Sequence, residues 1–448
     1  MFATQRRGRL VLTAAALGIG ALILTACSSS GGTTSGNNNP DTKPAVAGGP
    51  YGTFKGQSLT LSRWAGDPWT SGQQTAATAW DKATGAKLTI SAVPYENLQS
   101  KQALTLSSGS SSYDILYVHP SWFGEFAKAG YLAPIGKYLS DTKRNPSGFS
   151  AASYLPSVLS QGAYKGTQYC LPDFVSTIVV GYRTDVFKQA GLAAPKTTSD
   201  ILKDAAILNG KNGMSGIVMP GEATGAVSDV FSSLLTAQDN WWYNAAGTKD
   251  TLSTKAATKA LDFYTTAAKY APSGLLSMAV DDAATVAAQG KAAMVVDTTP
   301  SLSALEDPTK STTVGKWAYV PIEFTANKPG GELIYWNWCI AASSKHKDAA
   351  YSFLQYYTDT EQQAKVALAA STLGATKDFY KDKSVTSKLP FLPAVNAALS
   401  NANPQPSLAS WPTIQNTIET SVQQAILGKE TVAQAVAAMH TALQGLSN

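Results

Sequence analysis

Hydrophobic and polar positions along the first third of the chain predict strands that alternate with amphipathic helices. The three predicted strands are Ser58–Trp64, Lys87–Val93 and a mostly apolar run over 113–118. Apolar residues recur at helical spacing over 73–83, 97–106 and 123–129. Gly85 and Gly130 directly follow two of these helices, where glycine commonly ends a helix.

This alternation of strand and helix is typical of a parallel α/β sheet. In such sheets a ligand lies beyond the carboxyl ends of the strands. Those ends fall at 64–69, 93–96 and 119–122. The candidate binding residues there are Trp64, Asp67, Trp69, His119 and Ser121. Asp67 also suits a turn before Pro68, and His119 precedes Pro120, so structural roles stay open for both.

The first 26 residues have the pattern of an export signal. Arg6, Arg7 and Arg9 precede an apolar run over 10–26, which is short for a membrane span. The run closes on Leu24-Thr25-Ala26-Cys27, which resembles the lipobox of bacterial lipoproteins. That resemblance implies that Cys27 is lipidated and becomes the new N-terminus. Both Sec and twin-arginine export remain open.

A polar tether follows the lipidation site. Residues 28–50 are mostly Ser, Gly, Thr, Asn and Pro and cannot build a core. A flexible segment of this length reaches roughly 26 Å. We therefore assign residues 27–52 to the lipidated cysteine and its tether, on the outer face of the cytoplasmic membrane.

Composition narrows the class of ligand. Charged residues are only 15% of the 448, and the formal charge of +5 falls to +2 once the three arginines of the signal are removed. This balance gives no reason to expect nucleic acid as a partner. Three His and three Cys exclude a site built from many such ligands, so we expect no metal and no cofactor. The 10 Trp and 19 Tyr residues suit neutral, flat ligands.

Several longer segments occur along the chain in the same order as in a known protein family. They include WAGD at 64–67, YENLQSKQALTLSSGSSSYDILYV, YKGTQYCLPDFVSTIVVGYRTDVFKQAGL, GKAAMVVDTTP, the strand around YWNWCI and WPTIQNTIETSVQQAILGKETVAQAVAAM. Over about 59–446 they resemble the maltose-binding-protein-like solute-binding lipoproteins (family 1) of ABC sugar importers. The resemblance implies two α/β lobes, joined by crossing strands, that close by hinge motion on a ligand in the cleft.

The resemblance also implies lobe boundaries. We expect a first lobe of residues 53–173 plus 321–357 and a second lobe of 174–320 plus 358–448. The chain departs from the family pattern at three places: Cys170 replaces a usual Gly, Thr299-Pro300 stand where a Trp is usual, and Gly330-Gly331 lie four residues before the aromatic strand.

Four tryptophans are candidate ring platforms for a sugar. Trp336 and Trp338 are two apart in a predicted strand, so they point to one face. Trp411 begins a predicted helix, where the resemblance implies an aromatic contact, and Trp242 belongs to an adjacent pair with Trp241. Each could instead fill the core.

Carboxylates are the candidate partners of the sugar hydroxyls, since each oxygen can accept hydrogen bonds. The three further candidates are Asp173 at the expected hinge, Glu222 and Asp297. Asp297 could equally cap the turn that follows it.

Cys170 and Cys339 remain once Cys27 is assigned to lipid. Both lie in predicted strands of one lobe, and an exported pair is more often oxidised than not. We predict a disulfide, which requires Cα atoms within about 7 Å.

Enzymatic signatures such as HExxH, GxSxG and the P-loop do not occur in the sequence. We therefore expect a binding protein and not an enzyme: a monomeric receptor that captures a carbohydrate, an oligosaccharide or glycoside, and delivers it to an ABC permease. The alternatives are a receptor for a non-sugar solute, a surface carbohydrate-active enzyme and a structural adhesin.

Overall fold

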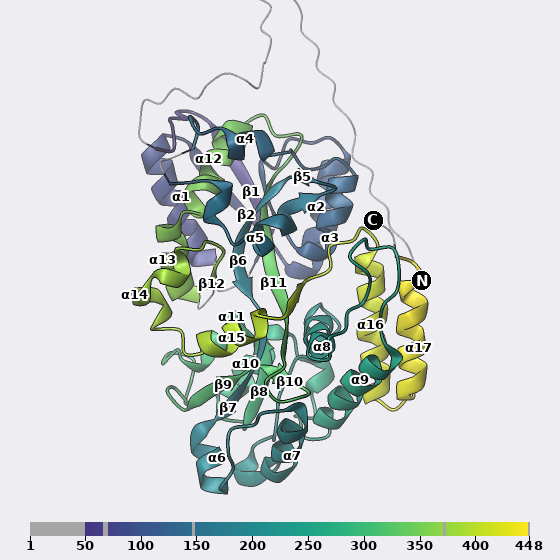
Figure 1. The fold of residues 1–448 in the computed structure, drawn as a ribbon. Coiled ribbons are helices and arrows are strands. Elements are labelled where there is room, and N and C mark those ends of the chain that lie inside the picture. The colour runs from purple at the N-terminus through teal and green to yellow at the C-terminus, as the bar shows by residue number, and fades with distance from the viewer. Residues whose placement is uncertain (1–49, 66–69, 146–147, 371–372, 447–448) are drawn as a thin grey trace, which may run out of the picture. The chain divides into compact units, whose positions relative to one another are not determined.

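The first lobe is built on a sheet whose strands come from distant parts of the chain (Figure 1). The computed structural model describes residues 50–65, 70–145, 148–370 and 373–446. The main strand order is β12-β6-β11-β3-β1-β2. The bounds are β1 Ser58–Trp64, β2 Lys87–Val93, β3 Ile115–Val118, β6 Cys170–Ser176, β11 Pro329–Ile340 and β12 Leu373–Gly374.

The predicted strand–helix alternation is confirmed. Strand β1 pairs in parallel with both β2 and β3, and β1 and β2 have the predicted bounds. The third strand is shorter than expected and begins at Ile115. Just before it, Asp114 accepts the N–H of Thr60 through its carboxylate at 2.9 Å and donates its own N–H to the Thr60 carbonyl at 2.9 Å. The first-lobe helices are α1 Thr70–Thr84, α2 Tyr95–Ser107, α3 Pro120–Lys128, α4 Gly136–Ser140, α5 Pro156–Leu159, α12 Lys347–Tyr357, α13 Thr360–Ala370 and α14 Lys383–Thr386.

The second lobe has its own three-stranded sheet and its own hydrophobic core. The strands run in the order β8 Met294–Thr298, β7 Ile178–Arg183, β9 Trp317–Val320. Its helices are α6 Thr184–Ala190, α7 Thr198–Leu208, α8 Ala226–Thr236, α9 Thr254–Ala268, α10 Val280–Ala288, α11 Thr299–Leu302, α15 Leu392–Leu399, α16 Trp411–Ile426 and α17 Val432–Leu443. The short strands β4 Ala163–Tyr164 and β5 Thr167–Gln168 pair with each other.

Two crossing segments lie side by side at the junction of the lobes. Strand β6 passes into β7 through the single residue Thr177. The first half of β11 pairs with β10 (Ile322–Glu323) and β13 (Ala402–Pro404), and its second half pairs with β3 and β6. The expected α/β fold of two lobes joined by crossing strands is confirmed.

Contacts of the segment after α12 bear on the expected lobe boundary at residue 358. We placed residues 358–448 in the second lobe, but α13 packs against α1 and β12 pairs antiparallel with β6. Pairing of Leu373 with Val175 extends the first-lobe sheet by one edge strand. The chain therefore turns toward the second lobe later than expected, through α15, which contacts β7, β9 and β11.

The structure contains the Cys170–Cys339 disulfide. The two residues are direct partners in the antiparallel β6–β11 pair, with Cα atoms 4.4 Å apart. Directly opposed residues of the closer type in an antiparallel pair have this separation. The bond ties the two crossing strands together at their first-lobe ends.

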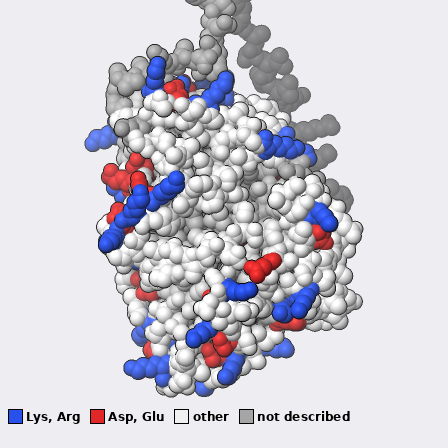
Figure 2. All heavy atoms as spheres, viewed as in Figure 1, with Lys and Arg blue, Asp and Glu red and all other residues white. Residues whose placement is uncertain are grey.

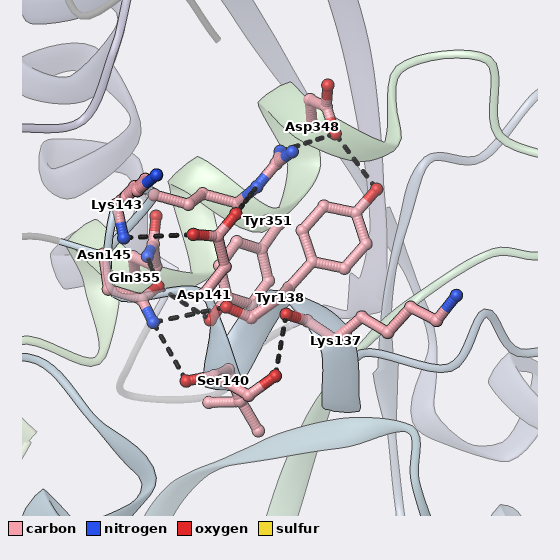
Figure 3. A network of polar contacts seen from close by, with 11 residues as sticks. Lys137, Tyr138, Ser140, Asp141, Lys143, Asn145, Asp348, Tyr351 and Gln355 are labelled. Carbon is pink, nitrogen blue, oxygen red and sulfur yellow. Dashed lines mark hydrogen bonds and ion pairs between the residues drawn. The ribbon is translucent and has the colours of Figure 1, made fainter. Parts of the chain in front are cut away.

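A polar network outside the cleft secures residues 136–145 to α12 (Figure 3). Asp348 accepts hydrogen bonds from Tyr138 at 3.0 Å and from Arg144 at 2.8 Å, and the guanidinium of Arg144 lies 4.7 Å from the Tyr138 ring centroid. The amide of Gln355 and the hydroxyl of Tyr351 donate to Asn145. Burial and the nearby Asp348 charge raise the pKa of Tyr138 to about 12, so its hydroxyl remains a donor.

On the face shown in Figure 2, acidic and basic side chains are intermixed, several of them gather at the left margin, and uncharged surface covers most of the upper middle. This distribution follows from the low charged fraction of the sequence. Within the described ranges, no helix combines the length and the apolar character needed to cross a bilayer.

Candidate functional site

A cavity of about 360 Å³ lies between the lobes, at the carboxyl ends of β1, β2 and β3. Trp64 ends β1, Tyr95 begins the helix after β2, and His119 directly follows β3. These three side chains line the cavity together with Trp336 from β11. The position agrees with the rule for parallel α/β sheets.

The first-lobe wall of the cavity is aromatic. The ring of Trp336 stacks on Trp64 with centroids 5.3 Å apart and on Tyr117 at 4.5 Å, both with an interplanar angle of 19°. Tyr95 meets Trp64 edge-on at 5.2 Å. Trp336 is therefore the middle ring of a stack that leaves it only 4% exposed. We call Tyr117, Trp336 and Trp64 the aromatic stack.

A register shift between β6 and β11 accompanies this geometry. The pairing slips between Tyr335 and Asn337, so that Asp173 and Phe174 together lie opposite Trp336. Pro172, which lacks a backbone N–H, is the β6 residue next to the slip. Such bulges re-aim side chains, and here Phe174 reaches the cavity while Asp173 does not.

Two buried charged residues contact the aromatic stack on the side away from the cavity. The hydroxyl of Tyr117 donates to Asp173 at 2.7 Å. Arg63, which is fully buried, donates to the backbone carbonyl of Trp64 at 2.8 Å and lies 5.3 Å from the Tyr117 ring centroid. Burial raises the pKa of Asp173 to about 6, while hydrogen bonds and the Arg63 charge oppose the rise.

His119 presents a neutral ring to the cavity. It is the N-cap of α3, and its Nδ1 accepts the N–H of Ser121 at 3.3 Å and contacts the Ser121 hydroxyl at 2.8 Å. Burial lowers the pKa of His119 to about 3. Because Nδ1 is an acceptor, the ring proton is on Nε2, which makes no hydrogen bond with the described residues.

The second-lobe wall is acidic. Glu222, Asp229 of α8, and Asp281 and Asp282 in the first turn of α10 line it. The hydroxyl of Ser301 donates to Asp281 at 3.1 Å. Among the described residues that line the cavity, none is Lys or Arg.

Asp229 sits beside other buried acids. The amide of Gln405 donates to Asp229 at 2.7 Å, and the carboxyl group of Glu332 lies within hydrogen-bonding reach. Burial raises the pKa of Asp229 to about 6. Burial and the Asp229 charge raise the pKa of Glu332 as well.

A second cavity of about 230 Å³ adjoins the first and shares Tyr95, Thr224 and Gly225 with it. Glu419 lines it and accepts the backbone N–H groups of Gly225 at 2.9 Å and Ser228 at 3.2 Å. It thereby caps the start of α8, although burial raises the pKa of Glu419 to about 8. The two cavities together make up the cleft between the lobes.

Comparisons with known proteins agree with this architecture. The family "Bacterial extracellular solute-binding protein" matches residues 31–364. The chain belongs to this family. Membership implies export from the cytoplasm.

Relatives of this solute-binding protein include the mannitol-binding protein of Pseudomonas aeruginosa, 29% identical over 268 residues. That alignment covers 58% of this chain and 59% of the relative, so this chain matches less than two thirds of it. Similar solved structures include maltose-bound MalE3 of T. maritima, at TM-score 0.77, 19% identity and coverage of 86% and 99% of the two chains. A ribitol complex from Agrobacterium radiobacter K84 has TM-score 0.77, 24% identity and coverage of 87% and 98%. These likenesses show the fold.

The cleft of this solute-binding protein contains part of the expected residue set. Trp64, His119, Glu222 and Trp336 line the larger cavity, and Ser121 lines the adjoining one. Asp67 and Trp69 lie outside the described residues.

Five expected contacts lie away from both cavities. Trp338 is fully buried among Tyr117, Tyr357 and Phe353, and Asp173 supports Tyr117 from behind. Asp297 is fully buried, and its carboxylate accepts the N–H of Thr298 at 2.7 Å.

The other two are core residues of the second lobe. The indole N–H of Trp242 donates to Ser232 at 2.8 Å, and the ring of Trp411 lies 5.8 Å from that of Trp242. Trp338, Asp173 and Trp411 are positioned by partners far away in sequence, which spacing alone does not reveal.

Several residues that line the cavity were not among the binding residues expected from the sequence. Tyr95 lies within the strand-end segment 93–96, so position could have revealed it. Asp229, Asp281 and Asp282 lie in helices of the second lobe, and no motif marks them.

We predict that Trp336→Ala and Trp338→Ala separate binding from stability. Loss of the ring at 336 should weaken carbohydrate binding by about 2–4 kcal/mol, or roughly 30- to 1,000-fold in Kd. Trp338→Ala should lower the free energy of unfolding by about 3–5 kcal/mol and leave Kd per folded molecule nearly unchanged. Calorimetric titration and denaturant unfolding measure the two effects. Equal losses of affinity in both variants would contradict the assignment.

We predict that His119→Asn flattens the pH dependence of stability below neutrality. The folded pKa of about 3 lies below the ordinary value near 6.5. Between these two values the unfolded chain binds a proton at this histidine and the folded chain does not. The free energy of unfolding therefore decreases as pH falls from about 6.5 toward 3. Asn keeps a capping oxygen without the titration. Urea unfolding at pH 7 and pH 5 should show a loss that is about 2 kcal/mol smaller in the variant; identical losses would disprove the prediction.

Proposed function

We propose that this protein is the substrate-binding component of an ABC importer that captures a carbohydrate between its lobes. The observation that carries the proposal is the cleft itself, in which an aromatic wall from one lobe faces carboxylates from the other. Ring faces suit the apolar side of a sugar, and carboxylates accept hydrogen bonds from its hydroxyl groups. Hinge motion of the lobes would bury the ligand.

The relatives support a polyol or sugar ligand. One is named for mannitol, and similar structures are titled as complexes with maltose and ribitol. The two adjoining cavities, of about 360 and 230 Å³, favour a ligand longer than one ring, an oligosaccharide or glycoside. The alternative is a receptor for a non-sugar solute, such as an amino-acid derivative, a polyol or a peptide.

Delivery and location complete the proposal. The loaded monomer presents both lobes to a permease and returns the ligand chemically unchanged, without catalysis and without a cofactor. Cys27 carries the lipid that anchors the chain to the outer face of the cytoplasmic membrane. Residues 1–26 and the tether to residue 49 lie outside the described residues.

A thermal-shift screen tests the ligand class. Among mannitol, ribitol, maltose, maltotriose and related sugars, at least one should stabilise the protein by about 2.7 kcal/mol at 100 times its Kd. Small-angle scattering with that sugar should show a smaller radius of gyration, because the lobes close. Stabilisation by amino acids or peptides alone would favour the alternative, and steady conversion of the sugar would indicate an enzyme.

Mass spectrometry tests the anchor. Protein extracted from membranes should begin at Cys27 and carry the mass of a diacylglyceryl group, and Cys27→Ser should release the chain from the membrane. A mature chain that begins at another residue would contradict lipidation.

A further inference from the structure

The charge of the cleft is unbalanced. Glu222, Asp229, Asp281 and Asp282 line the larger cavity, and no described lining residue is Lys or Arg. His119 adds no positive charge, because its Nδ1 already accepts a hydrogen bond from Ser121. The cavity therefore offers four carboxyl groups and no cation of its own.

The protein keeps this arrangement at a cost in stability. Asp229 is 8% exposed, and it lies near Glu332 and Glu419, which are 1% and 3% exposed. Burial raises the pKa of Glu332 and, to about 8, that of Glu419, so these two acids are mainly neutral near pH 7. Asp229 is the member of the group that carries charge there, and no basic side chain among the described residues forms an ion pair with it. A buried carboxylate without a cation is unfavourable unless something else supplies the charge. A feature that opposes folding at the wall of a binding cavity points to a role in binding.

A second, independent group faces the ligand space. His119 lines the cavity and is only 5% exposed. Its Nε2–H has no hydrogen-bond partner among the described residues. This N–H requires an acceptor, such as a hydroxyl oxygen of the ligand. The cavity thus presents one hydrogen-bond donor and an excess of carboxyl groups to the same molecule.

Resting on the function proposed above, we propose that the ligand is an amino-substituted carbohydrate, in which a protonated amine replaces one hydroxyl group. An ammonium group has three donors and no acceptor, and it matches the carboxylates of Asp229 and Asp281. The ring of Trp64 is only partly buried and borders the cavity, and aromatic rings also attract cations. The same field repels sugar acids and sugar phosphates.

The test compares a first set of open-chain ligands with three different charges and a second set in which one cationic aminosugar is matched with two neutral sugars. Titration calorimetry near neutral pH uses D-glucamine, D-glucitol and D-gluconate, and then D-glucosamine, D-glucose and N-acetyl-D-glucosamine. The amine of each set should bind about tenfold tighter than its hydroxyl counterpart. Its affinity should fall as salt rises, because charge attraction is screened. The carboxylate should not bind.

Variants locate the effect. Asp281→Asn, at an exposed position in the first turn of α10, should reduce the ratio of amine affinity to neutral-sugar affinity about tenfold, whatever it does to the affinity for the neutral sugar itself. Asp229→Asn should do the same, and Asp281→Asn alone suffices if that buried variant does not fold. Asp262→Asn, on the exposed side of α9, is the matched control and should change nothing.

The outcomes separate the two proposals. Binding of the neutral sugar as tightly as the amine would overturn this inference and leave carbohydrate capture intact. Absence of binding by every compound of all charge states, in this test and in the wider sugar screen, would overturn both. A preference for the amine that survives Asp281→Asn and Asp229→Asn would also refute the role of these carboxylates.

Discussion

The stacking of Trp336 between Tyr117 and Trp64 is the interaction on which the binding site depends. It joins three strands, β1, β3 and β11, at the edge where the parallel strands end and the chain crosses between lobes. Stacked aromatic pairs contribute about 0.5–1.5 kcal/mol each beyond the area that they bury. A rigid wall made in this way presents a preformed surface to a ligand, so little conformational entropy is lost on binding.

The aromatic stack in turn depends on buried polar groups. Asp173 accepts the Tyr117 hydroxyl, which anchors that ring, and Arg63 donates to the backbone carbonyl of Trp64, which fixes the main chain at the other end of the stack. Removing one member of such a buried set would leave the other charge without compensation. The same side chains therefore support the first-lobe core and the shape of the cleft.

The two lobes make different contributions to recognition. The first supplies flat apolar surface and one neutral donor at His119, while the second supplies carboxylates on helices α8 and α10. Neither wall alone can surround a ligand in the cleft. A ligand that contacts both stabilises the arrangement in which the lobes face each other, which is the thermodynamic basis of closure.

The sequence by itself determined the local elements and the family resemblance. Alternating side chains were enough for the bounds of β1 and β2, and strand-end position was enough to select Trp64 and His119, because these signals are carried by neighbouring residues. Only the tertiary structure decided which ring meets the ligand space. Trp336 and Trp338 lie two residues apart in one strand, and Asp173 and Phe174 are adjacent, so the sequence pattern does not separate the members of either pair. Their roles diverge because β11 pairs with β3 and β6 from more than 150 residues away, with a slip in register opposite Trp336. Acids such as Asp229 and Asp281 reach the cleft through the same long-range packing, and no local pattern encodes such a contact.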